Sequence, residues 1–234
     1  MVAAGSGERL GAPVPKAFVP LRGRPLLAWC LDALAGARVV EHLVLVAPAG
    51  WEDAARDAVP AGLPAPAVVA GGATRARSVA RGLLAVPARC ATVLVHDAAR
   101  PLVTPAHVRA VLGAVAAADG ALAAAPLADT LKRVAPDGAV TDTPDRSGLW
   151  RAQTPQAFRA AALRGAVARA EADGTLDAAT DCSALVTRAA GRVVVVPADA
   201  ANLKVTTPDD LALAELVLAS RARGTAPSVP DAVG

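Results

Sequence analysis

The chain has 234 residues, of which 54% are hydrophobic and 19% are charged. This composition is typical of a large folded domain with a sizeable core, and it excludes extensive disorder. The formal net charge is +3, and the aromatic residues are three tryptophans and two phenylalanines. A nucleic-acid-binding protein usually gathers basic residues and stacking rings on one surface. We therefore expect no nucleic-acid partner.

The longest apolar stretch, residues 110–127, is interrupted by Asp119, Gly120 and Pro126. It is shorter than the roughly 20 clean apolar residues that a membrane helix needs. The N-terminus lacks the basic segment and apolar run of a secretory signal. The three cysteines lack CxxC spacing, which favours reduced thiols over a metal or disulfide role. We expect a cytoplasmic protein without a membrane partner.

Short apolar runs alternate with helical patterns along the chain. In chain order, the sequence predicts helix 25–35, strand 43–47, helix 51–58, strand 67–70, helix 75–86, strand 92–96, helix 105–118, strand 121–125, helix 155–170, helix 183–190, strand 192–196 and helix 208–220. Thr104-Pro105 and Thr207-Pro208 are typical helix starts, with a capping hydroxyl before proline. Strands separated by such helices indicate an α/β fold with a doubly wound, mostly parallel sheet.

Residues 127–153 depart from this alternation. The alternating run 130–134 precedes Pro136-Asp137-Gly138, which is a turn signal because proline presets φ and glycine accepts positive φ. The segment therefore predicts an inserted β-hairpin arm. A lone two-stranded ribbon is marginally stable in water, so we expect the arm to lie against a second subunit. The rest of 1–220 is predicted to form one domain, and 221–234 a flexible tail.

The first strand is unusually short in the sequence. Met1, Val2 and Ala3 precede a glycine loop, whereas a typical strand has about 5–6 residues. Either the first strand is stunted, or the natural start lies upstream of Met1.

The glycine loop, residues 3–11, is the first candidate site. Its glycines at 5, 7 and 11 allow backbone N–H groups to approach an anion closely. It is not a Walker loop, and Leu10 occupies the place of the third glycine in the dinucleotide fingerprint. Arg9 and Lys16 would suit the charge that builds on a triphosphate. The alternative is a flexible loop with solvated charges.

Two further segments follow predicted strands. Residues 71–79 open a helix, where free N–H groups favour an anion, although a plain turn capped by Thr74 explains them too. Asp97 and Arg100 follow the strand 92–96, at the sheet edge where ligands bind in open α/β sheets. They would suit a hydroxyl-rich substrate or a hydrated Mg²⁺, and the alternative is a structural ion pair between them. His96 is interpreted as a packed histidine.

Eight motifs, in order and spacing from residue 2 to about 219, resemble those of the 2-C-methyl-D-erythritol 4-phosphate cytidylyltransferases. They are Ala-Ala-Gly-Ser-Gly-Glu-Arg-Leu-Gly at 3–11 with Lys16, Gly-Gly-x-x-Arg-x-x-Ser-Val at 71–79, His-Asp-Ala-Ala-Arg-Pro at 96–101, Asp-Thr-Leu-Lys at 129–132, Asp-Arg-x-Gly-Leu-Trp at 145–150, Gln-Thr-Pro-Gln at 153–156, Thr-Asp at 180–181 and Asn-Leu-Lys-Val-Thr at 202–206.

The resemblance implies a Rossmann-like nucleotidyltransferase that converts CTP and 2-C-methyl-D-erythritol 4-phosphate to 4-diphosphocytidyl-2-C-methyl-D-erythritol and pyrophosphate. Mg²⁺ is expected mainly on the CTP phosphates, without a protein metal site. The implied catalytic residues are Arg9, Lys16, Arg146 and Lys204. The implied nucleotide-binding residues are Ala3, Ala4, Gly5, Gly7, Gly72, Ala73, Ser78, Asp97 and Ala98. The implied substrate contacts are Asp97, Arg100, Thr130, Thr154 and Thr180. The family works as a homodimer clasped by the arm, so Arg146 would reach the partner's site.

This chemistry needs no covalent nucleophile, and the sequence contains no Ser/His/Asp or Cys/His arrangement that would supply one. Two alternatives stay open: a cytidylyltransferase for another polyol phosphate, such as ribitol 5-phosphate, and a non-catalytic nucleotide-binding dimer. The chain departs from the family pattern at three positions. Val2 stands where a full apolar strand usually ends in proline, so we expect an upstream start. Ala73 and Cys182 stand where acids are common.

Overall fold

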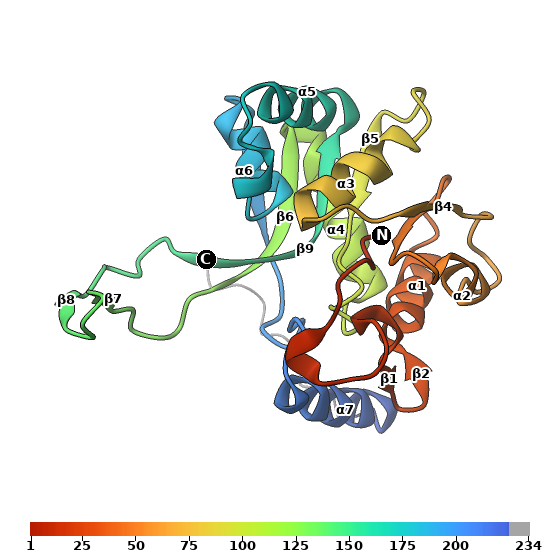
Figure 1. Ribbon diagram of the computed structural model, residues 1–234, viewed down its shortest axis with the longest axis horizontal. Coiled ribbons are helices and arrows are strands. Elements are labelled where there is room, and N and C mark those ends of the chain that lie inside the picture. Colours follow the sequence, from red (N-terminus) through yellow and green to blue (C-terminus); the bar gives the residue numbers. More distant parts are fainter. Residues whose placement is uncertain (225–234) are drawn as a thin grey trace.

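The computed structural model describes residues 1–224. Four strands form a sheet in the order β10 (Val193–Pro197), β6 (Gly120–Pro126), β9 (Trp150–Arg159) and β5 (Thr92–Val95). Two more strands, β3 (Val44–Ala47) and β4 (Ala67–Ala70), pair in parallel. Val2 joins the two groups, because it bridges in parallel to Val46 of β3 and to Asp97 just after β5. Figure 1 shows β6 and β9 in the centre of the molecule and β4 to one side of them.

The sheet is mixed, which corrects the expectation of a mostly parallel one. β9 is antiparallel to both β5 and β6, whereas β6 and β10 are parallel. Residues 155–159 belong to β9, so the helix predicted at 155–170 begins at Ala160 instead. The reason is tertiary: Ala157 and Phe158 are fully buried between two neighbouring strands, and this burial outweighs the helix-start signal of Pro155.

The other predicted helices and strands are present, and one short ribbon is added that the sequence did not predict. The helices are α1 (Leu26–Ala37), α2 (Glu52–Asp57), α3 (Arg75–Leu84), α4 (Pro105–Ala114), α5 (Ala160–Ala172), α6 (Cys182–Arg188) and α7 (Pro208–Ala222). Short β1 (Pro20–Leu21) and β2 (Arg24–Pro25) form a small ribbon. The caps are confirmed, because the hydroxyls of Thr104 and Thr207 accept the backbone N–H groups of His107 and Asp210. Of the predicted tail, residues 225–234 lie outside the described residues.

An antiparallel ribbon forms within the predicted arm, whose last residues, 150–153, belong to β9 instead. Strands β7 (Arg133–Val134) and β8 (Val140–Asp142) pair in an antiparallel ribbon, and Figure 1 shows it at the end of a long excursion away from the body of the protein. Val134 and Val140 are 53% and 60% exposed. An arm this exposed contributes little to the stability of its own chain.

The body of the domain is densely packed around β6 and β9. Gly120 opens β6, and a Cβ at this position would lie 2.4 Å from the ring of the fully buried Phe158. Glycine is required here because the aromatic ring occupies the space of a side chain. Within the described residues, no helix combines the length and the apolar character needed to cross a membrane.

Candidate active site

A pocket of about 610 Å³ opens where the glycine loop, the start of α3, the end of β5 and the segment 204–206 meet. Twelve of the residues predicted from the sequence line it: Ala3, Ala4, Gly5, Gly7, Arg9, Lys16, Gly72, Ala73, Ser78, Asp97, Ala98 and Lys204. These residues are far apart in the chain, and the fold gathers them at one edge of the sheet, as expected for an open α/β sheet.

The glycine loop curls back on itself and brings Lys16 to the pocket. Gly7 has φ +80°, and a Cβ there would come within 2.9 Å of the Cβ of Lys16. The Lys16 N–H donates to the carbonyl of Gly5 at 3.2 Å. Any larger residue at position 7 would therefore be strained and would push Lys16 away from the loop.

The segment before α3 lies directly against the glycine loop. A Cβ at Gly71 would lie 2.2 Å from the Cβ of Ala4, so only glycine allows this approach. Ser78, which is 2% exposed, accepts the Gly72 N–H through its hydroxyl at 3.0 Å. Thr74 caps the helix by accepting the Arg77 N–H. The capped turn of the alternative interpretation is therefore present, and the same turn also forms one wall of the pocket.

Asp97 lies between two cations at the floor of the pocket. Its carboxylate pairs with the Arg75 guanidinium at 2.8 Å and with the Lys204 ammonium at 3.1 Å. Burial alone would raise the pKa of the Asp97 carboxyl, but the charges of Arg75 and Lys204 outweigh it and hold that pKa well below its usual range. Asp97 therefore stays ionised and fixes both cations in place.

Arg75 is the residue of this triad that the sequence analysis quoted in a motif but did not assign to the site. The sequence signal was its position in the first turn of α3, one turn before Ser78. The predicted alternative of an Asp97–Arg100 ion pair is wrong. Arg100 instead donates to the carbonyls of Asn202 at 2.8 Å and Ala152 at 3.2 Å.

Lys16 lies in a strongly positive environment. Burial, together with the nearby charges of Lys204 and Arg9, lowers the pKa of Lys16 from 10.5 to about 8. Such a shift means that the pocket disfavours further positive charge and would welcome an anion. A polyphosphate entering the pocket would relieve this repulsion.

A buried hydrogen-bond network that includes Thr154 and His96 holds the backbone of Asp97. The Thr154 hydroxyl accepts the Asp97 N–H at 3.1 Å, and it lies 3.0 Å from Nδ1 of His96. The Arg100 carbonyl, 3.2 Å from Nε2 of His96, can only accept, so Nε2 carries the ring proton and donates to it. Nδ1 of the neutral ring then accepts the proton of the Thr154 hydroxyl. Burial lowers the pKa of His96 to about 3, so the imidazole is neutral. The interpretation of His96 as a packed histidine is confirmed.

A second set of bonds holds the segment that carries Lys204. The Asn202 side chain donates to Oε1 of Gln153 at 2.8 Å and to the Thr154 carbonyl at 3.0 Å. The Gln153 side chain donates to the Asp199 carbonyl at 3.2 Å. These amides tie the segment 199–206 to β9 and thereby position Lys204.

The remaining predicted residues lie outside the pocket of a single chain. Thr154 is 3% exposed and occupied by the network below Asp97. Thr130 and Arg146 are exposed on the arm, where Arg146 donates to the carbonyl of Ala128. Thr180 is exposed next to Asp181, the N-cap of α6. Among the residues that the structure describes, no group of three or more His, Cys, Asp or Glu is placed to hold a metal ion.

Thr154→Val tests the network. The variant removes the acceptor for the buried Asp97 N–H and the donor to His96, so we expect the free energy of unfolding to fall by about 1–3 kcal/mol. Thr154→Ser keeps the hydroxyl and should restore most of that stability. Urea unfolding followed by circular dichroism measures both. Equal stability of Thr154→Val and the parent chain would show that the hydroxyl is unimportant.

Comparison with known proteins supplies the family. A family model described as 2-C-methyl-D-erythritol 4-phosphate cytidylyltransferase matches residues 1–220. A protein of that name from Deinococcus radiodurans is 50% identical over 213 residues, covering 91% of this chain and 85% of that protein. One from Parasynechococcus marenigrum is 44% identical over 229 residues, covering 94% and 97%.

Solved structures that carry the name of the same enzyme are also similar to this chain. The chain is similar to the crystal structure of 2-C-methyl-D-erythritol 4-phosphate cytidylyltransferase from Thermus thermophilus, with TM-score 0.76, 36% identity and coverage of 92% of this chain and 95% of that one. It is also similar to 4-diphosphocytidyl-2C-methyl-D-erythritol synthase from Anaerococcus prevotii, with TM-score 0.80, 28% identity and coverage of 93% and 95%. The chain therefore belongs to the 2-C-methyl-D-erythritol 4-phosphate cytidylyltransferase family.

Proposed function

We infer that this chain transfers the cytidylyl group of CTP to 2-C-methyl-D-erythritol 4-phosphate, giving 4-diphosphocytidyl-2-C-methyl-D-erythritol and pyrophosphate. Family membership over residues 1–220 supports the reaction class and the substrate. The observation that carries the assignment is the convergence of Arg9, Lys16 and Lys204 on one pocket beside a glycine loop. This arrangement suits a reaction between two phosphate groups.

We propose that the nucleotide occupies the side of the pocket formed by the glycine loop and the start of α3. The residues assigned to it are Ala3, Ala4, Gly5, Gly7, Gly72, Ala73, Ser78, Asp97 and Ala98. Two features support this assignment: the glycines carry no side chains that would keep phosphates away from the backbone, and the N-terminal end of α3 is favourable for negative or polar groups. Ala73 lacks the acid common in the family, so it can contribute only backbone contacts.

In the proposed reaction, an oxygen of the substrate phosphate attacks the α-phosphorus of CTP. A new P–O bond forms, the bond to the β-phosphate bridge breaks, and pyrophosphate leaves with the electron pair. Negative charge spreads over the equatorial oxygens and the leaving group during this displacement. We assign Arg9 and Lys16 to that charge, because fixed cations cost no reorganisation when it develops.

The acceptor phosphate also needs cations, because it must approach another anion. We assign this role to Lys204, which Asp97 holds at the pocket, and to Arg146 from the arm of a second subunit. Asp97, Arg100, Thr130, Thr154 and Thr180 are proposed on the acceptor side. Of these, Arg100 and Thr154 would act by supporting Asp97 and Lys204, since Nη1 of Arg100 and the Thr154 hydroxyl already have partners there.

We propose that the arm, residues 127–153, clasps a second copy of the chain. Its exposed apolar side chains support this, since Leu131, Val134, Val140 and Trp150 are 37%, 53%, 60% and 40% exposed. A partner would cover such a patch. The cysteines at 30, 90 and 182 are free, which is compatible with a reducing compartment, and we propose the cytoplasm.

We propose that Mg²⁺ reaches the site on the CTP phosphates. Both carboxylate oxygens of Asp97 are engaged by Arg75 and Lys204, which leaves this carboxylate poorly suited as a metal ligand. Bound in that way, the ion would neutralise charge on the triphosphate.

Pyrophosphate release tests the assignment. The protein is incubated with CTP, Mg²⁺ and one polyol phosphate at a time, including 2-C-methyl-D-erythritol 4-phosphate and ribitol 5-phosphate. We expect release with the first and little with the second. Preferential turnover of ribitol 5-phosphate would favour the other polyol cytidylyltransferase, and CTP binding without any turnover would favour the non-catalytic dimer.

Lys16→Ala should lower kcat by about 10²–10³, equivalent to roughly 3–4 kcal/mol of transition-state stabilisation. A smaller change is expected in CTP affinity, because the proposed role of Lys16 is to meet charge that develops during the reaction. The matched control is Arg169→Ala, which removes an exposed cation on α5 that does not line the pocket. Equal losses in kcat and CTP affinity would restrict Lys16 to ground-state binding.

The lowered pKa of Lys16 predicts a pH dependence. The ammonium is present below pH 8 and is lost as the pH rises through about 8, so kcat/KM for CTP should fall by up to about tenfold per pH unit above that point. Bound phosphates favour the ammonium, so kcat should fall at a higher pH. Lys16→Arg should abolish the fall, because arginine keeps its charge. A flat profile of the parent chain up to pH 9.5 would contradict this role.

A further inference from the structure

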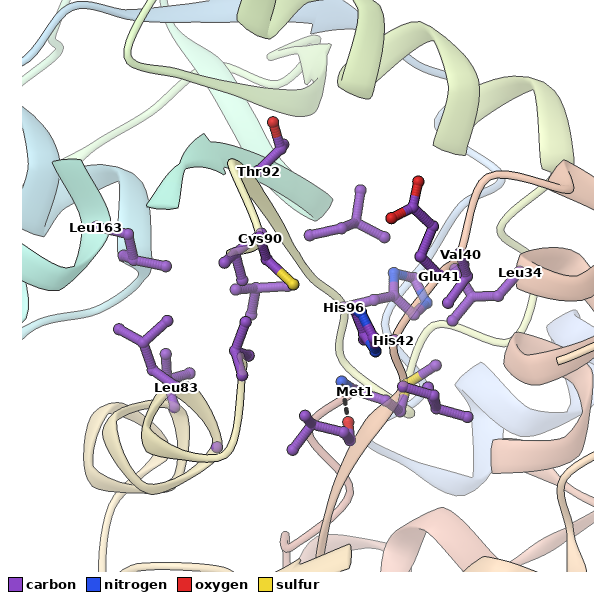
Figure 2. Close-up of a pocket in the computed structure, with 18 of the residues that line it drawn as sticks. Met1, Leu34, Val40, Glu41, His42, Leu83, Cys90, Thr92, His96 and Leu163 are labelled. Carbon is purple, nitrogen blue, oxygen red and sulfur yellow. Dashed lines mark hydrogen bonds between the residues drawn. The ribbon is translucent and has the colours of Figure 1, made fainter. Parts of the chain in front are cut away.

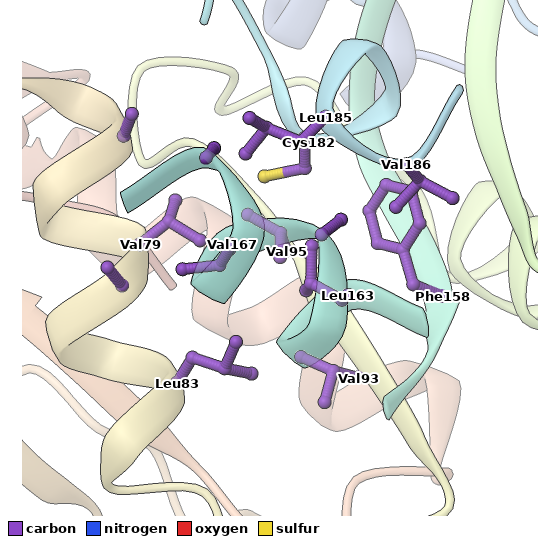
Figure 3. Packing of buried hydrophobic residues seen from close by; sticks show 14 of the residues in the cluster. Val79, Leu83, Val93, Val95, Phe158, Leu163, Val167, Cys182, Leu185 and Val186 are labelled. Carbon is purple, nitrogen blue, oxygen red and sulfur yellow. The ribbon is translucent and has the colours of Figure 1, made fainter. Parts of the chain in front are cut away.

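The acceptor segment, residues 176–182, carries Thr180 and lies against the first turn of α3. It begins with a short 3₁₀ turn, Leu176–Ala178. Leu176 and Cys182 are each 1% exposed and belong to the same apolar cluster as Val79 of α3. Figure 3 shows Cys182 within this cluster. Both ends of the segment are therefore anchored in the core, and Thr180 is exposed between them.

The wall of the candidate active site reaches this segment. Arg75 lines the pocket and pairs with Asp97. Its Nη1 also donates to the sulfur of Cys182 at 3.8 Å. Thr180 is two residues before Cys182 in the chain, so the acceptor segment continues the wall of the pocket beyond Arg75. A group that extends from the pocket past Arg75 would therefore contact this segment.

Asp177 binds the first turn of α3 through both of its carboxylate oxygens. Oδ1 accepts the hydroxyl proton of Thr74 at 2.9 Å. Oδ2 accepts two N–H groups of Arg77, from Nε at 2.9 Å and from Nη2 at 2.6 Å. The Thr74 hydroxyl in turn accepts the backbone N–H of Arg77 at 3.2 Å. These bonds close a ring between two segments that are 100 residues apart in the sequence.

The ring favours the ionised form of the Asp177 carboxyl. Hydrogen bonds from the Arg77 side chain, and next from the Thr74 hydroxyl, lower the pKa of Asp177. The contact is therefore present at neutral pH. The side chains of Arg77 and Asp177 are 50% and 44% exposed, and an ion pair of that exposure contributes little to the stability of the whole fold. Its effect is expected on the local position of the acceptor segment.

Two carboxylates hold the two ends of the loop that presents Thr180. Asp177 holds one end against α3. Asp181 holds the other end, because its Oδ2 accepts the side-chain amide of Gln156 on β9 at 2.9 Å. Only residues 178–180 lie between these two anchors. The position of Thr180 relative to the pocket therefore depends on both carboxylates.

Helix α3 has other anchors that do not involve Asp177. In its first turn, Arg75 is paired with Asp97. Near its other end, Leu83 packs in the apolar cluster, and Figure 2 shows Leu83 at the wall of a separate cavity that Leu163 also lines. Loss of the Asp177 contact would therefore free the acceptor segment and leave α3 in place.

We propose that Asp177 is a positioning residue for the acceptor substrate. It acts through the Arg77 guanidinium and the Thr74 hydroxyl, which fix the acceptor segment and so hold Thr180 beside the pocket. Asp177 itself does not touch the reacting groups. This role rests on the proposed function, because Thr180 is assigned there to the acceptor side.

Steady-state kinetics of two variants test this role. Asp177→Asn and Arg77→Gln each break the ion pair, so each should raise KM for 2-C-methyl-D-erythritol 4-phosphate by about threefold to fivefold. KM for CTP should change by less than about twofold, because α3 keeps its other anchors. The double variant should match the single variants, since all three remove the same contact.

The two variants also separate positioning from a purely electrostatic effect. Asp177→Asn removes a negative charge and Arg77→Gln a positive one, so an electrostatic effect on an anionic substrate would shift KM in opposite directions. The matched control is Asp32→Asn, which breaks an ion pair with Arg24 of similar exposure, 46% and 40%, outside the pocket. The control should leave KM unchanged. Opposite shifts in the two variants, no shift in either, or an equal shift in the control would overturn the proposal.

Amide hydrogen exchange gives a readout that needs no turnover. The N–H groups of Ala178 and Ala179 donate to the carbonyls of Thr175 and Leu176 at 3.2 and 3.1 Å. In both variants these two amides should exchange at least about threefold faster, whereas the Ser78 amide should exchange as in the parent chain. Unchanged exchange at Ala178 and Ala179 would overturn the proposal. Absence of turnover by the parent chain would reject the proposed function, and faster exchange in the variants would then still support the anchoring of the segment by Asp177.

Discussion

The ion triad of Arg75, Asp97 and Lys204 is the interaction on which the site depends. It joins the start of α3, the end of β5 and the segment after β10, three parts of the chain with no covalent proximity. A buried carboxylate is unfavourable unless it is paired. The ion pairs of Asp97 therefore make its burial favourable, and they also position Lys204 at the pocket. Loss of Asp97 would leave the two cations without their shared counter-charge.

The excess of positive charge around this triad gives the site its chemical character. The positive charges of Lys16, Arg9 and Lys204 exceed the negative charge of Asp97. Burial and the neighbouring charges of Lys204 and Arg9 lower the pKa of Lys16 to about 8. The pocket is thus poised for polyanions rather than for neutral ligands. Repulsion between these cations lowers the stability of the folded protein, and bound phosphates would offset that loss.

Local chemistry made much of this fold predictable. Capping threonines and the alternation of strands and helices located most elements, and Gly71 and Ser78 were recognisable as a strand-to-helix turn beside a ligand site.

Strand β9 was missed because Pro155 is an ordinary helix start in isolation, and only its neighbours β5 and β6 favour a strand. The partner of Asp97 was missed for a similar reason: Arg100 is three residues away in sequence, but its guanidinium binds backbone carbonyls, and the distant Arg75 takes its place. In the proposed dimer, the side chains that the arm contacts would lie on a second chain, and no single sequence pattern specifies them.

The central claim is that cations from separate segments hold two phosphate groups together. Its most direct test is a crystal structure of the protein with a non-hydrolysable CTP analogue and 2-C-methyl-D-erythritol 4-phosphate. The account predicts Arg9 and Lys16 within hydrogen-bond distance, about 3.2 Å or less, of the nucleotide phosphates. It places Lys204 and Arg146 of the partner subunit on the acceptor phosphate. A complex in which these four side chains face solvent, or in which the phosphates lie outside the pocket, would contradict the account.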